Sequence, residues 1–565
     1  MSPGGSAQRR YETLRAYFVE GATAAEAAAR FGYTEATVAA MARDFRAGDR
    51  NFFVDRRPGP RVAPAKAAAR EAVVRLRAQG YSIDAITAAL ADGPTPLNRT
   101  GVWEICRDEG LDRLPTRAPS KRPPPLRERQ CRVRVIRWPD APVVEDTSYA
   151  GLLLLVPALV ELDLPAAVAA ARMPGTSEVP ALASVLSLLA LKAIGRRRVS
   201  HVDDVAVDAG LATFAGLESL PKATALGTYS YRLSRAHDQT LLAAVAGAAR
   251  RSGQVEGASF DLDFHAIMHF GDDVALETHY VPRRSQRTES VLTFFAQDGQ
   301  TRNLVYANAT CTKNSQAGEA LAFARHWREI SGSVPELLVF DSKVTTGAGL
   351  AALDAEGITF LTLRARNAKL TAVLEALPDN EWTTISLDRR GPHHRPQVHE
   401  DIVTVRGCPR PLRQIAVRGL GHDHPTLILT NDSTSKPGRL VDRYAKRMNI
   451  EQRLEEGIRS FHLDALSSAV ALNVDLDTTL TVIAQLAYDW LRRRLPGYET
   501  VTPDTIWRRF ISTKGSVTLG PKEVVVRLGE RTYSPVLRAA QLPTTAVPWW
   551  QGRTLRYELP PGKRK

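Results

Sequence analysis

The stretch PELLVFDSK, residues 335–343, is an apolar run that ends in Asp341 and continues with small or polar side chains. A short run of this kind is typical of a buried strand in an α/β sheet, with its acid at the strand end. Ligand and metal sites collect at such strand ends. Asp341 is therefore a candidate site residue if other acids of the chain converge on it.

A second acidic strand is predicted in the stretch ASFDLDFHAI, residues 258–267, where acidic and apolar side chains alternate. In a strand, Asp261, Asp263 and His265 share one face. Around these two strands we expect strands at 290–295 and 303–309, a helix at 317–330, a helix at 348–355 and a strand at 359–363. This order is that of an RNase H-like mixed sheet, which sets carboxylates of its first and fourth strands side by side. Either Asp261 or Asp263 is the carboxylate that the first strand contributes to this pair, and we favour Asp263.

A third acid is expected on a helix that contains the stretch DRYAKRMNIEQRL, residues 442–454. The spacing of Tyr444, Arg447 and Glu451 makes them project from one face of that helix. An arginine one turn before an acid can grip a phosphate while the acid holds a metal ion. The competing interpretations are a surface ion pair for Glu451, with Glu455 and Glu456 as rival acids, and a solvent-exposed strand-end acid for Asp341.

The cation that such acids would hold is predicted from their chemistry. Adjacent carboxylates repel one another unless a cation lies between them. Mg²⁺ (or Mn²⁺) prefers oxygen ligands and keeps positions open for phosphate. A pair of these ions can activate an attacking oxygen and stabilise a leaving oxygen at phosphorus. Three converging acids would therefore indicate metal-dependent phosphoryl transfer.

The three acids also carry a resemblance to a known family. Tyr444, Arg447 and Glu451 resemble the Tyr-x2-Arg-x3-Glu-x6-Lys signature of one group of DDE transposases of bacterial insertion sequences. Ile458 stands at the lysine position of that signature, and Arg459 follows it. The stretches 263–265 with 271–273, and 340–343, resemble the regions of the first and second acids.

The resemblance implies an RNase H-like catalytic core in which Asp263, Asp341 and Glu451 bind two divalent ions. It implies 3′-end cleavage followed by strand transfer, with double-stranded DNA, as terminal inverted repeats and target DNA, for a partner. Tyr444, Arg447 and Arg459 would contact that DNA. A homodimer on the DNA is expected.

The N-terminal part of the chain has the layout of a helix-turn-helix. Apolar residues recur at helical spacing in three bursts between residues 10 and 45, and Thr23 and Thr34 are placed to cap the second and third helices. The third helix of such a module lies in the major groove of DNA. We expect Thr37, Arg43 and Arg46 to face DNA.

A second copy of this layout is predicted over residues 65–109. Its helices are expected at 65–78, 83–90 and 100–109, with Ser82 as a cap and with Arg99 and Arg107 near the last helix. Two helical bundles that bind protein, or nothing, are the competing interpretation. Residues 1–140 contain 25 Lys or Arg against 16 Asp or Glu, which favours DNA as the partner.

Composition agrees with a nucleic-acid partner and a reducing compartment. The 565 residues carry a formal net charge of +14, which favours a polyanionic partner. The four cysteines form no C-x-x-C pair, so neither a zinc site nor a disulfide framework is suggested. No apolar stretch is long enough to span a bilayer. We expect a protein of the bacterial cytoplasm, associated with the nucleoid and not with a membrane.

The predicted organisation is a multidomain α/β protein. From the N-terminus we expect a helix-turn-helix (1–60), a second helix-turn-helix (61–118), a basic Pro-rich linker (119–145), a helical domain (146–250), the first part of the RNase H-like core (251–385), a β-rich insertion (386–432), the second part of the core (433–500) and a small C-terminal β module (501–565).

Some elements leave alternatives open. Tyr149 to Ala171 and Tyr229 to Arg250 are each expected to be one helix, and a short strand is expected at 532–533. The histidines between 393 and 424 are interpreted as loop or phosphate-contacting residues rather than zinc ligands. Trp549 and Trp550 are expected in the core, although aromatic residues of a basic β module can also stack on DNA.

The predicted function is that of a DNA transposase. One alternative is a non-catalytic DNA-binding protein, either a decayed transposase or a helix-turn-helix regulator. Another takes Asp261 and Asp263 as the nucleophile and acid of a phosphohydrolase of the haloacid dehalogenase type. That class has Thr or Val two residues beyond its second Asp, where this chain has His265.

Overall fold

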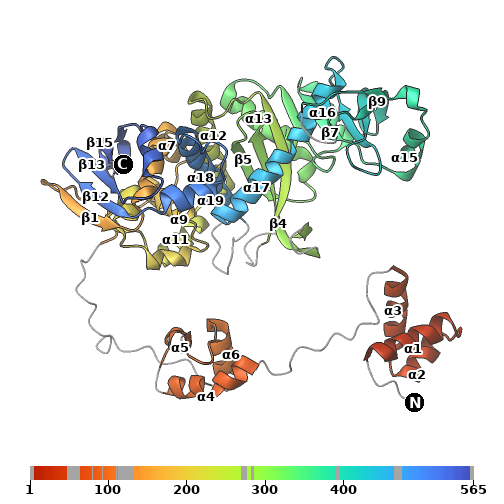
Figure 1. Ribbon diagram of the computed structural model, residues 1–565, viewed down its shortest axis with the longest axis horizontal. Helices are drawn as coiled ribbons and strands as arrows, with labels where there is room; N and C mark the ends of the chain where they lie inside the picture. Colours follow the sequence, from red (N-terminus) through yellow and green to blue (C-terminus); the bar gives the residue numbers. More distant parts are fainter. Residues whose placement is uncertain are drawn as a thin grey trace. The chain divides into compact units, whose positions relative to one another are not determined.

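The computed structural model describes residues 6–47, 64–78, 81–91, 93–109, 111, 132–268, 277–281, 286–388, 393–463 and 474–559. The chain divides into two compact units, residues 1–128 and 129–565 (Figure 1). The first unit is helical in its described parts, and the second contains two mixed sheets together with helices. The chain is thus a multidomain α/β protein.

The first helix triplet of unit 1 is formed by α1 (Ser6–Phe18), α2 (Ala24–Phe31) and α3 (Glu35–Ala47). Thr23 and Glu26 form a capping box at the start of α2, an arrangement whose loss costs about 1 kcal/mol. The Thr34 hydroxyl accepts a hydrogen bond from the backbone N–H of Thr37 at 3.2 Å. Both predicted caps are confirmed, and the triplet has its own small core around Leu14 and Val38.

The second triplet is formed by α4 (Pro64–Ala78), α5 (Ile83–Ala91) and α6 (Arg99–Asp108). The Ser82 hydroxyl accepts from the backbone N–H of Ala85 at 3.1 Å, as a cap of α5 should. Val73, Ile86 and Val102, one from each helix, are completely buried together. The repeated layout that the sequence predicts is therefore present.

The helical part of unit 2 is more broken than the sequence predicted. The expected helix from Tyr149 to Ala171 is three pieces. The break before the last piece arises because Asp163 takes a left-handed conformation (φ 48°) and Pro165 can only begin a new helix. The expected helix from Tyr229 to Arg250 is interrupted by extended backbone at Leu233. The observed helical segments are η2 (Ala150–Leu155), α7 (Val156–Glu161), α8 (Leu164–Ala170), α9 (Ala181–Ala193), η3 (Val199–Asp204), α10 (Ala209–Ala215), α11 (Ala223–Tyr229), η4 (Ser230–Arg232) and α12 (Arg235–Arg251).

Helix α18 (Val474–Arg494) is the central element of this helical part. Its buried residues run without interruption from Val474 to Leu491, so it has no face toward solvent over that length. A helix that is buried all round must belong to a large core. It packs against α9, α12 and strand β5 (Leu304–Cys311) of the larger of the two sheets (Figure 1).

The larger sheet is built around three parallel strands. Strand β2 (Ser259–Met268) pairs in parallel with β6 (Leu337–Phe340), which pairs in parallel with β7 (Thr359–Leu363). On its other side β2 pairs with antiparallel β4 (Gln286–Asp298), whose far edge carries β3 (Glu277–Val281) and β5 (Leu304–Cys311). The predicted order of strands is confirmed, with β3 as an additional strand.

The β-rich stretch that follows does not form a sheet of its own. Strands β11 (Thr426–Thr430), β10 (Cys408–Arg418), β9 (Gln397–Val405) and the short β8 (Thr383–Thr384) continue the same sheet beyond β7. β11 pairs antiparallel with β7, so the direction of the sheet changes at that point. The inserted strands thereby extend the sheet that bears Asp341.

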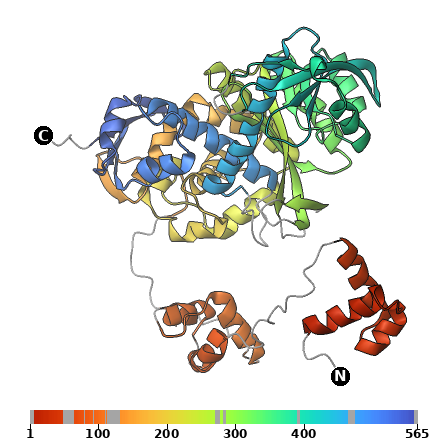
Figure 2. The ribbon, with the colours of Figure 1, turned by 45° about the vertical axis from the view of Figure 1, so that its right-hand side comes forward.

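Helices cover the two faces of the central strands. Helix α13 (Glu319–Ser331) packs Phe323 and Trp327 on Phe260, while α14 (Gly347–Ala355) and α15 (Ala368–Glu375) follow β6 and β7. Helices α16 (Pro437–Lys446) and α17 (Met448–Phe461) lie across the other face (Figures 1 and 2). The single helix expected to contain residues 442–454 is observed as these two helices, which meet at Arg447. Arg447 itself keeps helical backbone angles (φ −55°, ψ −33°).

The second sheet has the strand order β1-β12-β13-β15-β14. Its edge strand β1 (Val143–Thr147) comes from the region predicted as linker, and pairs antiparallel with β12 (Gly515–Leu519). The other strands are β13 (Glu523–Leu528), β14 (Thr545–Val547) and β15 (Arg553–Glu558). The strand expected at 532–533 is wrong, since Tyr533 is the residue before helix α20 (Ser534–Ala539).

Trp549 and Trp550 belong to the core between the second sheet and the helices. Their indole N–H groups donate to the carbonyls of Phe214 and Thr213, at 3.0 and 2.8 Å. Trp550 is completely buried. The expectation that these rings pack in the core is confirmed.

Within the described ranges, no single helix is both long enough and apolar enough to cross a membrane. The helices over Ala150–Glu161 and Leu164–Ala170, bent by 60° at the break between them, meet the length and composition test only as a pair.

Candidate active site

Asp263 and Asp341 come from adjacent parallel strands. Leu262 of β2 is in register with Phe340 of β6, and each of the two acids is the next residue of its chain segment. Neighbouring strands lie about 4.8 Å apart, so the two carboxylates start from adjacent backbone positions. The Asp341 carboxylate accepts hydrogen bonds from the backbone N–H and the hydroxyl of Ser342, at 2.6 and 3.3 Å.

The geometry separates the two candidates for the first acid. The Asp261 side chain is 2% exposed and accepts a hydrogen bond from Nη1 of Arg443 at 2.6 Å. The Asp263 side chain is 20% exposed, and its Oδ2 lies 3.7 Å from Nη1 of Arg447. Asp261 is thus fixed in a buried ion pair, whereas Asp263 reaches the surface beside Asp341.

Glu451 reaches the same place from α17. Its Oε1 accepts a hydrogen bond from Nη2 of Arg447 at 3.0 Å, and its side chain is 46% exposed. Arg447, only 8% exposed, therefore contacts Asp263 on one side and Glu451 on the other. Nε and Nη1 of Arg447 and the hydroxyl of Tyr444 are buried without a hydrogen bond of ordinary geometry.

The electrostatics of the site show that its charges interact. The pKa of Asp263 is raised to about 6, chiefly by burial; the charges of Glu451 and Asp341 also raise it, and Arg447 opposes them. Burial likewise raises the pKa of Tyr444 to about 12. Four charged groups from three separate segments of the chain thus share one place, with three negative charges against one positive charge.

The donor chemistry of this place fits a divalent cation. Carboxylate oxygens are the ligands that Mg²⁺ prefers, and the repulsion that raises the pKa of Asp263 is what a cation relieves. In the described part of the chain, no three His, Cys, Asp or Glu side chains are gathered closely enough to hold a metal ion as they stand. The three acids thus lie near one another without forming a ready metal site, and Arg447 lies between Asp263 and Glu451.

Arg443 is the residue of this site that the sequence analysis missed. It lies one helical turn before Arg447, and its Nη2 is a buried donor without a hydrogen-bond partner. The spacing of four residues was a signal that could have placed both guanidinium groups over the acids of β2. The predicted contribution of Asp272 and Asp273 to the first-acid region lies outside the described residues.

The predicted DNA-contacting residues of unit 1 are at the surface. Thr37, Arg43 and Arg46 lie exposed on α3, and the guanidinium of Arg46 stands 5.0 Å from the centre of the Phe18 ring. In the second triplet, Arg99 donates to Asp84 at 2.7 Å, and Arg107 lies over the Trp103 ring at 5.0 Å. These side chains are accessible, although Arg43, Arg99 and Arg107 already have acidic partners in Asp44, Asp84 and Asp108.

In unit 2, Arg459 is exposed on α17 and pairs with Glu455 one turn before it. Ile458, at the position of the signature lysine, is buried. The exposed cation is therefore Arg459, one residue later than in the signature. Glu456 pairs with Arg453 at 2.9 Å, so both rival acids of the helix are engaged with arginines other than Arg447.

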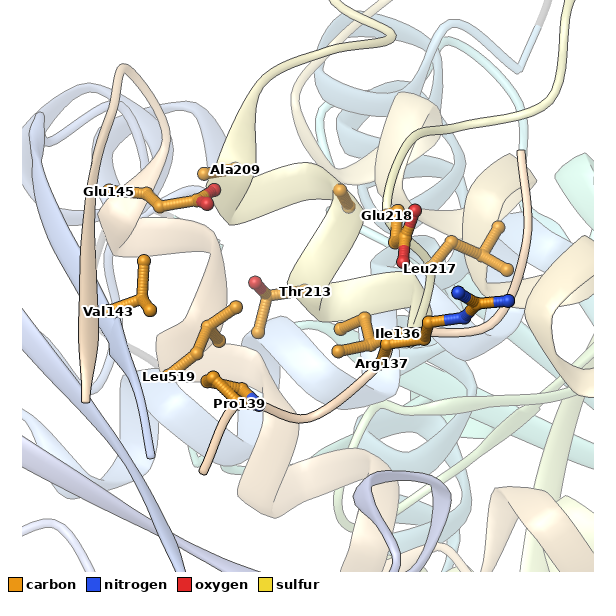
Figure 3. A pocket seen from close by; sticks show the side chains of 11 residues that line it. Ile136, Arg137, Pro139, Val143, Glu145, Ala209, Thr213, Leu217, Glu218 and Leu519 are labelled. Atoms are coloured by element: carbon orange, nitrogen blue, oxygen red, sulfur yellow. The ribbon is translucent and has the colours of Figure 1, made fainter. Parts of the chain in front are cut away.

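A cavity of about 320 Å³ lies elsewhere in unit 2, between β1, α10 and the chain around Ile136 (Figure 3). Its lining mixes apolar side chains such as Leu519 with the charged groups of Arg137 and Glu218. None of the three acids borders it, and Glu218 is bonded to Arg134 at 2.7 Å. The cavity is therefore separate from the candidate active site.

Comparison with known proteins gives little beyond the site itself. No model of a protein family matches the chain, and no curated protein matches it. Among solved structures, the chain is similar to the piggyBac transposase in a synaptic complex with hairpin DNA. That similarity has a TM-score of 0.35 at 12% identity, and covers 65% of this chain and 79% of the other.

Proposed function

We propose that this protein is a DDE-type transposase, which cleaves the 3′ ends of a DNA element and joins them to target DNA. The observation that carries the proposal is the convergence of Asp263, Asp341 and Glu451 around Arg447. The strand order β5-β4-β2-β6-β7, with β2, β6 and β7 parallel, is that of an RNase H-like sheet and supports it. The Tyr444, Arg447 and Glu451 spacing supports it independently.

Each residue has a distinct part in this proposal. Asp263, Asp341 and Glu451 would hold Mg²⁺ or Mn²⁺, which when bound would lower the pKa of an attacking water and stabilise charge on a leaving oxygen. Arg447 neutralises the carboxylates and presents donors that suit a phosphate. Arg443 holds Asp261 away from the surface, so that Asp263 alone projects from β2 toward Asp341. Water, and then a DNA 3′ hydroxyl, would be the nucleophiles.

The DNA partner is proposed from unit 1 and from charge. Two helix triplets with exposed arginines can read terminal inverted repeats, while unit 2 acts on the ends that they present. A homodimer on paired ends, in the bacterial cytoplasm, completes the proposal.

A non-catalytic DNA-binding protein is the second candidate. The observation that favours it is that Arg447 pairs with Glu451, and that no three described acids form a ready metal site. Such a protein would keep the DNA-binding surface of unit 1 and would lack nicking activity. The haloacid dehalogenase interpretation is disfavoured, because its nucleophile would be Asp261, which is buried against Arg443.

The test is metal-dependent nicking of the DNA that flanks the coding sequence. Full-length protein is incubated with labelled flanking duplex in Mg²⁺, in Mn²⁺, in Ca²⁺ or in chelator, and nicks are mapped on both strands. We expect nicks at one position per end in Mg²⁺ or Mn²⁺, and none with chelator. Specific binding without nicks in either metal would contradict the proposal and support the non-catalytic alternative.

A further inference from the structure

A second polar cavity, of about 370 Å³, lies beside the candidate active site. It is bordered by the β4–β5 turn, by α17 and by the end of α18 with the loop that follows it. Asn449, Gln452 and Glu456 line it from α17, and their helical spacing puts them on a different face of that helix from Glu451. The cavity is therefore across α17 from the three acids.

The arginines around this cavity are not all neutralised. Arg453 pairs with Asp489 and with Glu456, and Arg492 pairs with Asp489 at 2.9 Å. Arg302 has no acidic partner among the described residues, and its side chain is exposed. Arg493 donates only to the carbonyl of Thr301, at 3.3 Å. Arg302 and Arg493 thus border the cavity without an ion pair in the described part of the chain, while the carboxylate of Glu499, which also lines it, accepts from the backbone N–H of Gly497 at 3.0 Å.

The floor of the cavity is fixed and carries unused polar atoms. Gln297 is completely buried, its Nε2 donates to the carbonyl of Arg302 at 2.9 Å, and its Oε1 has no hydrogen-bond partner. Nε of Arg453 donates to the same carbonyl at 2.9 Å. Nε of Arg492 is also buried without a partner. The two hydrogen bonds to the Arg302 carbonyl therefore fix the turn that bears this residue. Polar side-chain atoms of Gln297 and Arg492 without hydrogen-bond partners lie around it.

The electrostatics of Arg493 agree with a missing anion. Burial lowers the pKa of its guanidinium, Asp489 opposes this, and the neighbouring charges of Arg492 and Arg453 lower it further. An anion placed between Arg302 and Arg493 would relieve that repulsion. A phosphate group suits the two planar guanidinium forks, and the side-chain amide of Asn449 adds a further donor.

We propose that this cavity binds a backbone phosphate of the DNA strand whose end lies at Asp263, Asp341 and Glu451. This inference rests on the proposed function, since it takes the occupant to be the substrate DNA. The cavity and Glu451 lie on the same helix, α17, so the bound phosphate would belong to a nucleotide close to the scissile one. The cavity would thus hold the strand in register with the acids.

The experiment compares the double variant Arg302→Gln/Arg493→Gln with the wild-type full-length protein. Affinity for the flanking duplex is measured over a series of NaCl concentrations. We expect the double variant to bind about tenfold more weakly at low salt, and its log–log salt dependence to be shallower by about one, as for the loss of one phosphate contact. Ethylation interference should lose one position close to the nick.

Two matched variants control for charge and for folding. Arg250→Gln/Arg251→Gln removes the same charge from the exposed end of α12 and should keep the wild-type slope. Arg302→Lys/Arg493→Lys keeps the charge and should retain most of the binding. A slope for the glutamine variant equal to that of the wild type, with its thermal unfolding unchanged, would overturn the proposal.

Two further arms separate the possible outcomes. Titration with inorganic phosphate alone asks whether the cavity takes a small free anion. Binding of phosphate that the glutamine variant loses, with an unchanged DNA slope, would overturn the assignment to DNA. The variant Asp341→Asn should keep the wild-type slope while losing nicks. A wild-type protein that shows the phosphate contact but never nicks would defeat the proposed function and leave the cavity assignment standing.

Discussion

The acids of α18 and the acids of the central sheet are both largely buried, but they are neutralised in different ways. Asp477 pairs with Lys192 at 2.6 Å, and Asp475 accepts from Arg235 at 2.8 Å. Asp489 receives donors from both Arg453 and Arg492. Each acid of this helix therefore has at least one cation of its own, held by close contact.

At the sheet, one cation serves two acids. Arg447 contacts both Asp263 and Glu451, while the carboxylate of Asp341 receives only the N–H and hydroxyl of Ser342. A buried ion pair in which each charge has its partner contributes to a unique fold. A group of acids with too few cations destabilises the folded protein unless a ligand supplies positive charge. The comparison teaches that the local balance of charge, rather than burial, distinguishes the site acids from the structural acids.

The largest effect is expected for Asp341→Asn. The substitution removes a metal-binding oxygen from the strand end, and should lower the nicking rate by more than about a thousandfold, which corresponds to about 4 kcal/mol of transition-state stabilisation. The melting temperature should stay unchanged or rise, because no cation loses its partner. Nicking and thermal unfolding are measured on the same preparation. Nicking at the wild-type rate would remove Asp341 from the site.

The opposite pattern is expected for Asp477→Asn on α18. The substitution leaves the Lys192 ammonium buried without a negative charge beside it, with only neutral oxygens, such as the carbonyl of Phe461 at 3.0 Å, as acceptors. Breaking such a buried pair should lower the free energy of unfolding by about 3 kcal/mol. Denaturant unfolding measures this loss, and nicking per folded molecule should be unaffected. A variant as stable as the wild type would show that the Lys192 pair is not structural.

The raised pKa of Asp263 predicts two pH effects of opposite sign. Nicking needs the carboxylate, so at limiting Mg²⁺, where protons compete with the metal for Asp263, its rate should fall by up to about tenfold per pH unit below about pH 6. Without divalent ions the folded protein favours the protonated acid, so stability should decrease as pH rises from about 4 to about 6, by about 2 kcal/mol at most. The variant Asp263→Asn should abolish both dependences. A rate that is flat from pH 7 to pH 5 would contradict this assignment.

The smallest effect is expected for Glu455→Gln, the matched control for Glu451→Gln. The two acids are similarly exposed, at 50% and 46%, and each pairs with an arginine on its own helix or at its start. Only Glu451 shares its arginine with Asp263. Glu455→Gln should change nicking less than about twofold, as for an exposed ion pair, whereas Glu451→Gln should behave like Asp341→Asn. Equal losses of nicking in Glu455→Gln and Glu451→Gln would contradict the assignment of Glu451, and not Glu455, to the active site.

The hydrophobic pattern predicted helices and strands well wherever a segment followed a single periodicity throughout. The strand at Thr359–Leu363 is observed as predicted, and so are the caps at Thr23 and Ser82. The failures are local too. An apolar run predicted one helix through Asp163, where left-handed backbone and the following proline break it.

The sequence by itself determined the residues that carry the chemistry: an acid within one strand, an acid directly after another, and a third acid four residues after an arginine. Only the tertiary structure decided which acids meet. Arg443 is 182 residues from Asp261, yet it holds that carboxylate and leaves Asp263 to face Asp341 and Arg447. The pairing of β1 with β12 was likewise beyond prediction. The physical reason is that periodicity reports which face of an element is buried, while the partner that buries it is set by contacts far apart in the chain.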